Sequence, residues 1–262
     1  METNYSEVTV GNFNTVRKKI LADVSGDTFS KAARYLPLCV AIILTIGVII
    51  TMMLGLKPSY LFKEGRPFTH FSGLLLLMIS ASSLHIFKIR WQNDPLPWHQ
   101  LYRKGFFVWL IMGTGFIFLW ADEVACYHEK MGNWIQAQNS GYTGIFAERF
   151  DSLVVGTYGI VSLAVLWIYR REFLDFIMCS KFFILGFSLL FLMVGLDFLT
   201  EDMKIIRMLT TDKVLGDRLF MLLEVMEDYF KLMAVAFFLR GFLEIRWQVL
   251  SENRETTPIY SN

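Results

Sequence analysis

The sequence predicts an all-α integral membrane protein with a bundle of six transmembrane helices. Of its 262 residues, 54% are hydrophobic and only 19% are charged, whereas soluble domains usually carry about 25% charged residues. Apolar segments long enough to cross a hydrocarbon core of about 30 Å, which takes roughly 20 residues, recur along the whole chain. We therefore expect one membrane-embedded unit and not a series of soluble domains.

Six segments meet this length requirement, and they are residues 36–56, 68–87, 105–127, 152–169, 182–199 and 219–243. An even number of spans places both termini on one side of the membrane. The predicted organisation is an N-terminal cytoplasmic arm (1–35), a six-span domain (36–243) and a C-terminal cytoplasmic tail (244–262). Apolar residues recur at helical spacing among basic ones in the arm, which is typical of a helix in the headgroup layer. A solvated or disordered arm is the alternative.

The distribution of basic residues predicts the orientation. Lys and Arg number 15 on the side that holds the termini and nine on the opposite side, with Lys231 inside the last span. Because cytoplasmic loops are enriched in Lys and Arg, both termini are predicted to lie in the cytoplasm. We thus expect a multi-pass protein of the cell membrane, with the lipid bilayer as its surroundings.

Composition and motifs exclude several function classes. Lys and Arg total 25 against 24 Asp and Glu, so the chain lacks the basic surplus that binds nucleic acid by counterion release. Its three cysteines form no CxxC pair, which argues against a disulfide framework or a thiolate zinc site. The sequence contains no phosphate-binding loop, dinucleotide fingerprint, GxSxG elbow or zincin motif. It also lacks the Glu-x-x-His pairs of ferritin-like di-iron sites. Whether the chain is an enzyme stays open.

Small residues inside the spans are expected to serve helix packing, because small side chains let helices approach closely in a membrane. These residues are Ser80, Ser82, Ser83, Gly113, Gly115 and Gly186.

Charged residues inside spans are the most informative feature, because they are costly in lipid and usually face a cavity or one another. In the predicted orientation, the acids of three spans fall in the outer third of the membrane. We take them as candidate cation- or proton-binding residues, with Lys231 as the internal counter-charge. The candidates are Asp122, Glu123, His128, Glu129, Asp197, Glu224, Glu227 and Asp228. So many acids at one depth repel one another unless cations, protons or Lys231 compensate.

Helical spacing gives these candidates a geometry. Glu224 and Asp228 are four residues apart and therefore share a helix face. Lys231 follows Asp228 by three residues and Glu227 by four, so we expect one of these two acids to form a packing ion pair with it.

The outer end of the third span supplies the candidate metal ligands. Asp122 and Glu129 share a face if the helix continues through His128. Imidazole and carboxylate groups suit divalent ions such as Ca²⁺, Mn²⁺, Fe²⁺ or Zn²⁺. A divalent metal ion is the cofactor that this chemistry would allow, with His128, Glu129, Glu224 and Glu227 as its candidate ligands.

The stretch 116–132, FIFLWADEVACYHEKMG, resembles the D-E-x4-H-E-x-x-G signature of a group of bacterial multi-pass membrane proteins of unknown function. The later stretches FLMVGLDFLTED and LLEVMEDYFKLMAVAFFLRGFLE resemble that group's acidic helix ends, although Asp197 stands where Glu is usual and Lys231 stands in an otherwise apolar turn. The resemblance implies no activity. It implies that one shared site contains Asp122, Glu123, His128, Glu129, Glu224 and Glu227.

These observations favour cation or proton binding coupled to transport or sensing, with His128 as the group that titrates near neutral pH. One alternative is a metal-dependent membrane enzyme that acts on a lipid or headgroup, with Glu129 or Glu123 as general base. Another is a membrane anchor or subunit, a homo-oligomer or a member of a larger complex, whose charges form interface pairs. The sequence does not choose between them.

Overall fold

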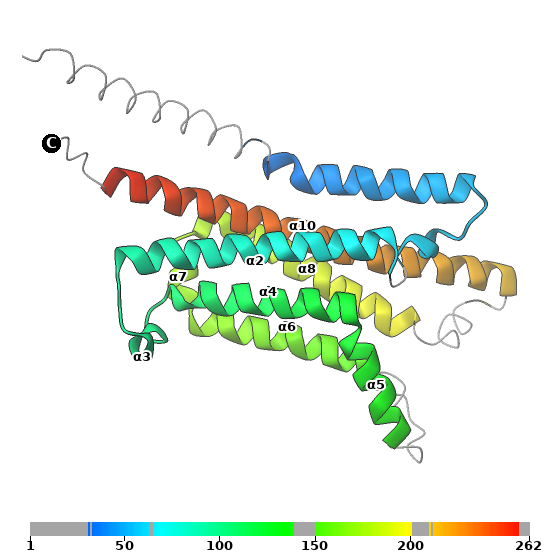
Figure 1. The fold of residues 1–262 in the computed structure, drawn as a ribbon. Helices are drawn as coiled ribbons and strands as arrows, with labels where there is room; N and C mark the ends of the chain where they lie inside the picture. The colour runs from blue at the N-terminus through cyan, green and yellow to red at the C-terminus, as the bar shows by residue number, and fades with distance from the viewer. Residues whose placement is uncertain are drawn as a thin grey trace, which may run out of the picture.

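The computed structural model describes residues 31, 33–62, 65–138, 150–200, 210 and 212–256. Every regular element in these ranges is a helix, which confirms the all-α prediction. Figure 1 shows the long helices side by side, with α3 and α7 at one end of the bundle and α5 at the other. Most of the predicted N-terminal arm lies outside the described residues.

The helices follow one another in the order expected for a bundle. They are an N-terminal helix (Ala33–Met53), η1 (Pro58–Leu61), α2 (Pro67–Asn93), α3 (Trp98–Leu101), α4 (Phe107–Ala125), α5 (Tyr127–Gln138), α6 (Phe150–Ile168), α7 (Arg170–Leu174), α8 (Ile177–Thr200) and α10 (Lys213–Thr256).

Four helices in the described part of the chain are long and apolar enough to cross a membrane, and they are Ala33–Met53, Pro67–Asn93, Phe107–Ala125 and Ile177–Asp197. They correspond to four of the six predicted spans. In α6 the apolar stretch is shorter, Gly156–Ile168. The remaining predicted span lies within α10, which is not among the four.

Helix α10 is the longest element, with 44 residues. At 1.5 Å per residue it extends about 66 Å, more than the roughly 40–45 Å of a bilayer with its headgroups. It packs along α8 and α2 (Figure 1). The helix continues to Thr256, so residues after the predicted boundary at 243 extend the last helix.

An aromatic cluster holds the middle of the bundle together. Trp109 on α4 and Phe242 on α10 are fully buried, and their ring centroids lie 5.9 Å apart. Phe242 also contacts Phe116 on α4 at 5.5 Å and Phe183 on α8 at 5.4 Å. The edge-on arrangement of these rings is favourable for aromatic pairs, and it ties α4, α8 and α10 into one core.

Hydroxyl groups link α2 to α4 directly. Ser80 donates a hydrogen bond to the carbonyl oxygen of Gly113 at 2.8 Å, and Ser83 donates to that of Trp109 at 2.7 Å. Both serines are buried. The prediction that these serines and Gly113 serve helix packing is therefore confirmed.

Glycines allow α8 and α10 to approach closely. A Cβ on Gly186 would lie 2.6 Å from the Phe238 ring, and a Cβ on Gly241 would lie 2.9 Å from the Phe183 ring. Each helix thus places a phenylalanine over a glycine of the other. The packing prediction is confirmed for Gly186 but wrong for Gly115, because a Cβ there would meet nothing within 4 Å.

The third predicted span ends earlier than expected. Cys126 adopts a left-handed conformation with φ of 55°, and its N–H bonds to the Asp122 carbonyl as a helix cap. A left-handed residue ends an α-helix, so α5 leaves in a new direction (Figure 1). The expectation that one continuous helix places Asp122 and Glu129 on a shared face is wrong for this reason.

The glycine contacts generate a stability prediction. In Gly186→Ala the new methyl group collides with Phe238, whose ring is held by Phe183 and Phe187. We expect the free energy of unfolding to fall by about 1–3 kcal/mol, the usual cost of overpacking. The measurement is denaturant unfolding of the purified protein in detergent. Gly195→Ala on the same helix is the control, because its Cβ meets nothing within 4 Å; equal losses in both variants would contradict the prediction.

Candidate functional site

A polar pocket lies where η1, α2, α4 and α10 meet. Its empty volume is about 190 Å³, including the part open to the outside. It is lined by Phe62, Phe68, Thr69, Ser72, Glu123, Asp228, Lys231 and Leu232. The pocket therefore combines two candidate acids and the predicted counter-charge with hydroxyl groups that composition alone did not single out.

An ion pair between α4 and α10 dominates this pocket. The Lys231 Nζ lies 2.7 Å from the Glu123 Oε2, and the Glu123 side chain is only 11% exposed. The prediction that Glu227 or Asp228 forms the ion pair with Lys231 is wrong, because the partner is Glu123 of α4 and not a residue of α10. A lysine side chain is long and flexible, so it reaches across the helix contact to Glu123.

Ser72 gives the pocket an unused hydrogen-bonding group. The residue is 1% exposed, and its Oγ has no hydrogen-bond partner among the residues that the structure describes. By contrast, the Thr69 hydroxyl one turn earlier donates to the Phe62 carbonyl at 3.1 Å. A buried hydroxyl without a partner costs free energy, so Ser72 marks a position where a bound group or a water molecule would be stabilised.

Further acids surround Asp228. Glu123, Glu224 and Asp197 all lie close enough to act on it electrostatically, as does Lys231. The structure thus brings acids from α4, α8 and α10 to the same end of the bundle. The acids therefore lie together at one end of the bundle, as expected from their positions along the predicted spans.

Glu227 lies at the contact between α8 and α10. Its Oε2 accepts a hydrogen bond from the Thr200 hydroxyl at 3.1 Å, and Asp197 and Asp228 act on it electrostatically. Thr200 is buried. This contact links the acids of α8 to those of α10.

The remaining candidate residues of the α4 end are separated from this pocket or lie outside the description. Asp122 is 5% exposed and acts electrostatically on Tyr158 of α6, so adjacent Asp122 and Glu123 serve different helix contacts. His128 and Glu129 belong to α5, but their side chains lie outside the described residues. Their predicted role as metal ligands stays a prediction.

The described side chains do not form a metal centre. No group of three or more His, Cys, Asp or Glu residues that could hold a metal ion occurs among them. The acids near Asp228 instead surround an ammonium group. What the arrangement can do chemically is bind and release protons, or exchange Lys231 for another cation.

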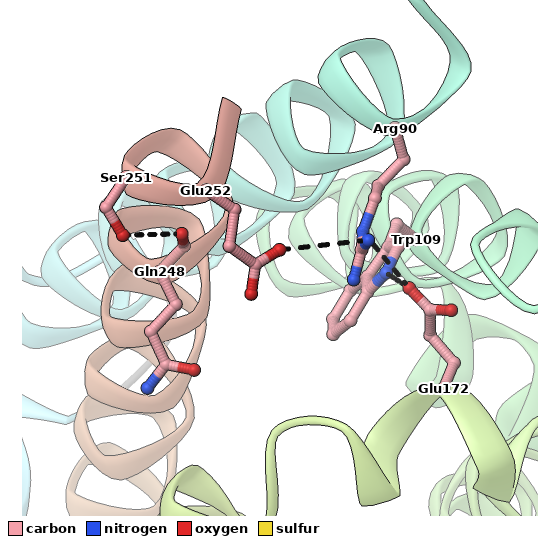
Figure 2. Close-up of polar contacts among 6 residues, drawn as sticks. All are labelled: Arg90, Trp109, Glu172, Gln248, Ser251 and Glu252. Atoms are coloured by element: carbon pink, nitrogen blue, oxygen red, sulfur yellow. Dashed lines mark hydrogen bonds and ion pairs between the residues drawn. The ribbon is translucent and has the colours of Figure 1, made fainter. Parts of the chain in front are cut away.

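A second polar network lies at the opposite end of the bundle, where Figure 2 shows Arg90 between two acids. The Arg90 Nε lies 3.6 Å from Glu172, and its Nη1 lies 3.9 Å from Glu252. The buried Trp109 indole N–H donates to the same Glu172 oxygen at 2.9 Å. This network joins α2, α4, α7 and α10, and its charges are compensated within the protein.

The apolar helices define the chain as an all-helical protein compatible with a membrane. Residues 35–244 match the model of a family described as Domain of unknown function (DUF8692), and the chain belongs to this family. No curated protein and no solved structure matches the chain. The resemblance to bacterial proteins with the D-E-x4-H-E-x-x-G signature stays a prediction.

Sequence reasoning missed Ser72, Thr69 and Thr200. All three hydroxyl residues lie within helices at the end of the bundle that carries the acids. Thr69 and Ser72 are three residues apart and so lie on one face of α2. That spacing could have indicated that both hydroxyl groups belong to one polar site. Serine and threonine in apolar helices usually serve packing, however, as Ser80 and Ser83 do.

The ion pair can be tested by a double-mutant cycle. Lys231→Met leaves Glu123 among other acids without its partner, and Glu123→Gln leaves the ammonium without its nearest carboxylate. We expect the first change to lower the free energy of unfolding by about 3 kcal/mol, the low end for breaking a buried pair. The combined variant should lose less than the sum of the two, with a coupling energy of about 1–3 kcal/mol. Additive losses in detergent unfolding would show that the two side chains do not interact.

Proposed function

We propose that the chain is a six-span protein of the cell membrane, with both termini in the cytoplasm, whose acidic end binds protons or a cation in a step coupled to transport or sensing. The binding groups are Glu123, Asp197, Glu224, Glu227 and Asp228, with Lys231 as their internal counter-charge. His128 and Glu129, at the start of α5, extend the site in this proposal.

The charge balance of the cluster carries the proposal. In the described part of this end of the bundle, the carboxylates of Glu123, Glu227 and Asp228 act on the ammonium group of Lys231. Asp197 and Glu224 act in turn on Asp228. In a medium of low dielectric constant, so many negative charges cannot all persist without compensation. Bound protons or a bound cation would therefore stabilise this group of carboxylates.

Protons fit the geometry more directly than a metal ion does. Lys231 already occupies the position next to Glu123 that a cation would take, and the described residues gather no metal-ligand group. A protonated Asp228 could donate a hydrogen bond in the pocket where the Ser72 hydroxyl lacks a partner. A cation that enters the pocket would have to compete with the ammonium group.

The ion pair provides the link from binding to conformation. Lys231 is attracted by Asp228 and Glu227 as well as by Glu123. When a proton neutralises one of the competing acids, Glu123 becomes the stronger partner, and the attraction between α4 and α10 changes. A site that alters a helix contact when it takes up charge is what transport and sensing both require.

The two alternatives are less well supported. An anchor whose charges pair with a neighbouring subunit would turn its acids outward, whereas Glu123 and Asp228 line an interior pocket. A metal-dependent enzyme would need a metal-ligand group, and nothing in the described residues favours one.

The test is the thermal stability of the full-length protein in detergent, measured from about pH 5 to about pH 8 with and without added Na⁺, Ca²⁺ or Mn²⁺. Carboxylates crowded in the folded bundle bind protons more readily than in the unfolded chain, so stability falls as the pH rises. An added cation that binds the cluster should restore part of the loss at high pH. Asp228→Asn and Glu227→Gln should each reduce the dependence on pH and on cations, and Glu224→Gln should reduce the dependence on cations.

Asp217→Asn is the matched control, because Asp217 is an exposed carboxylate on the same helix. Its pH and cation dependence should equal that of the unmodified protein. If the unmodified protein melts at the same temperature at every pH, with and without the three cations, the proposed site does not bind protons or cations.

A further inference from the structure

The end of the bundle that carries the Arg90 network also contains a basic cluster without compensating acids. His85 and Lys88 lie one turn apart on α2, and Arg246 lies opposite them on α10. Arg246 and Lys88 both lie close enough to the His85 imidazole to act on it electrostatically, and both are cationic. The contact between the two helices therefore concentrates positive charge.

The described side chains supply no partner for this charge. None of them forms an ion pair or a hydrogen bond with His85, Lys88 or Arg246, and the buried Nε of Arg246 has no hydrogen-bond partner among them. Glu244, two residues before Arg246, instead acts on Arg240 and on Cys179. An arginine without an acid is unfavourable at a partly buried position.

The neighbouring Arg90 shows that the fold can compensate a guanidinium at this depth. Arg90 has Glu172 and Glu252 within 4 Å (Figure 2). Arg246 and Lys88, on the same two helices that carry Arg90 and Glu252, have no such acids among the described residues. The described residues thus leave the charge of this cluster without a balancing anion.

The position of the cluster matches the headgroup layer. His85 follows Pro67, the first residue of α2, by 18 residues, which corresponds to about 27 Å along the helix axis. A helix that enters the hydrocarbon core near Pro67 reaches its opposite boundary, at about 30 Å, between His85 and Lys88. Lys88 is exposed, and His85 and Arg246 are partly exposed.

We propose that Arg246, His85 and Lys88 bind the phosphate group of an anionic lipid headgroup at the contact between α2 and α10. The guanidinium offers a planar pair of N–H donors that suits phosphate oxygens. The imidazole and the ammonium group add further donors, and basic clusters between helices at the membrane boundary are a common recognition mode for such lipids. The lipid phosphate then neutralises a charge that the protein leaves unpaired.

The test compares lipids added to the full-length protein in detergent. Phosphatidylglycerol should raise the melting temperature by several degrees more than phosphatidylcholine, because its phosphate charge is not offset by choline. Arg246→Gln should remove most of this difference. Lys88→Gln should reduce it without affecting the fold, because Lys88 is exposed, and this variant decides the question where Arg246→Gln does not fold.

Arg103→Gln is the control, because it removes one positive charge from an exposed position in the α3–α4 connection. It should retain the full difference between the two lipids. Equal stabilisation by both lipids, or an unchanged difference in Lys88→Gln and Arg246→Gln, overturns the proposal. Inorganic phosphate is the third addition; stabilisation by inorganic phosphate equal to that by phosphatidylglycerol would identify a soluble phosphate as the ligand and overturn the assignment to a lipid.

Discussion

The need to neutralise one ammonium group inside a helix bundle organises the acidic end of this protein. Lys231 sits on α10 with Glu123 of α4 at 2.7 Å, and separating the two would leave each charge poorly solvated. The pair therefore links α4 to α10 at the pocket, and Ser72 of α2 lines the same pocket. Asp228 and Glu227 also attract the ammonium group, so they compete with Glu123 for it.

The two ends of the bundle carry opposite charge imbalances, separated by an apolar middle. One end holds more carboxylates than described cations. The other end pairs Arg90 with Glu172 and Glu252, but Arg246 and Lys88 form no ion pair with the described residues. Between them lie the rings of Phe116, Phe183 and Phe242, which pack against one another and contain no charged group. In this region α8 and α10 pack closely, with phenylalanines over glycines. The apolar region therefore separates the two charged ends.

Much of the fold was predictable, because periodicity and apolar length are local properties. The helical class, four of the apolar spans and the packing role of Ser80, Ser83 and Gly113 all follow from residues close in the chain. The early end of α4 did not follow, because Cys126 is not a residue that usually adopts a left-handed conformation. The gathering of acids at one end was predictable from their depth along each helix, whereas the separation of Asp122 from Glu123 was not.

What the sequence by itself determined is the helical class, the apolar helices compatible with a membrane and the position of each charge along its helix, since these depend only on composition and on rise per residue. Tertiary structure decided which charges meet. Helical spacing predicted that Lys231 pairs with Glu227 or Asp228, but α4 and α10 both pack against α2, and this arrangement brought Glu123 within reach of Lys231. It also left Ser72 unpaired in a pocket and Arg246 without an acid. Rotation of a helix about its axis sets these contacts, and that rotation is fixed by packing across the whole bundle.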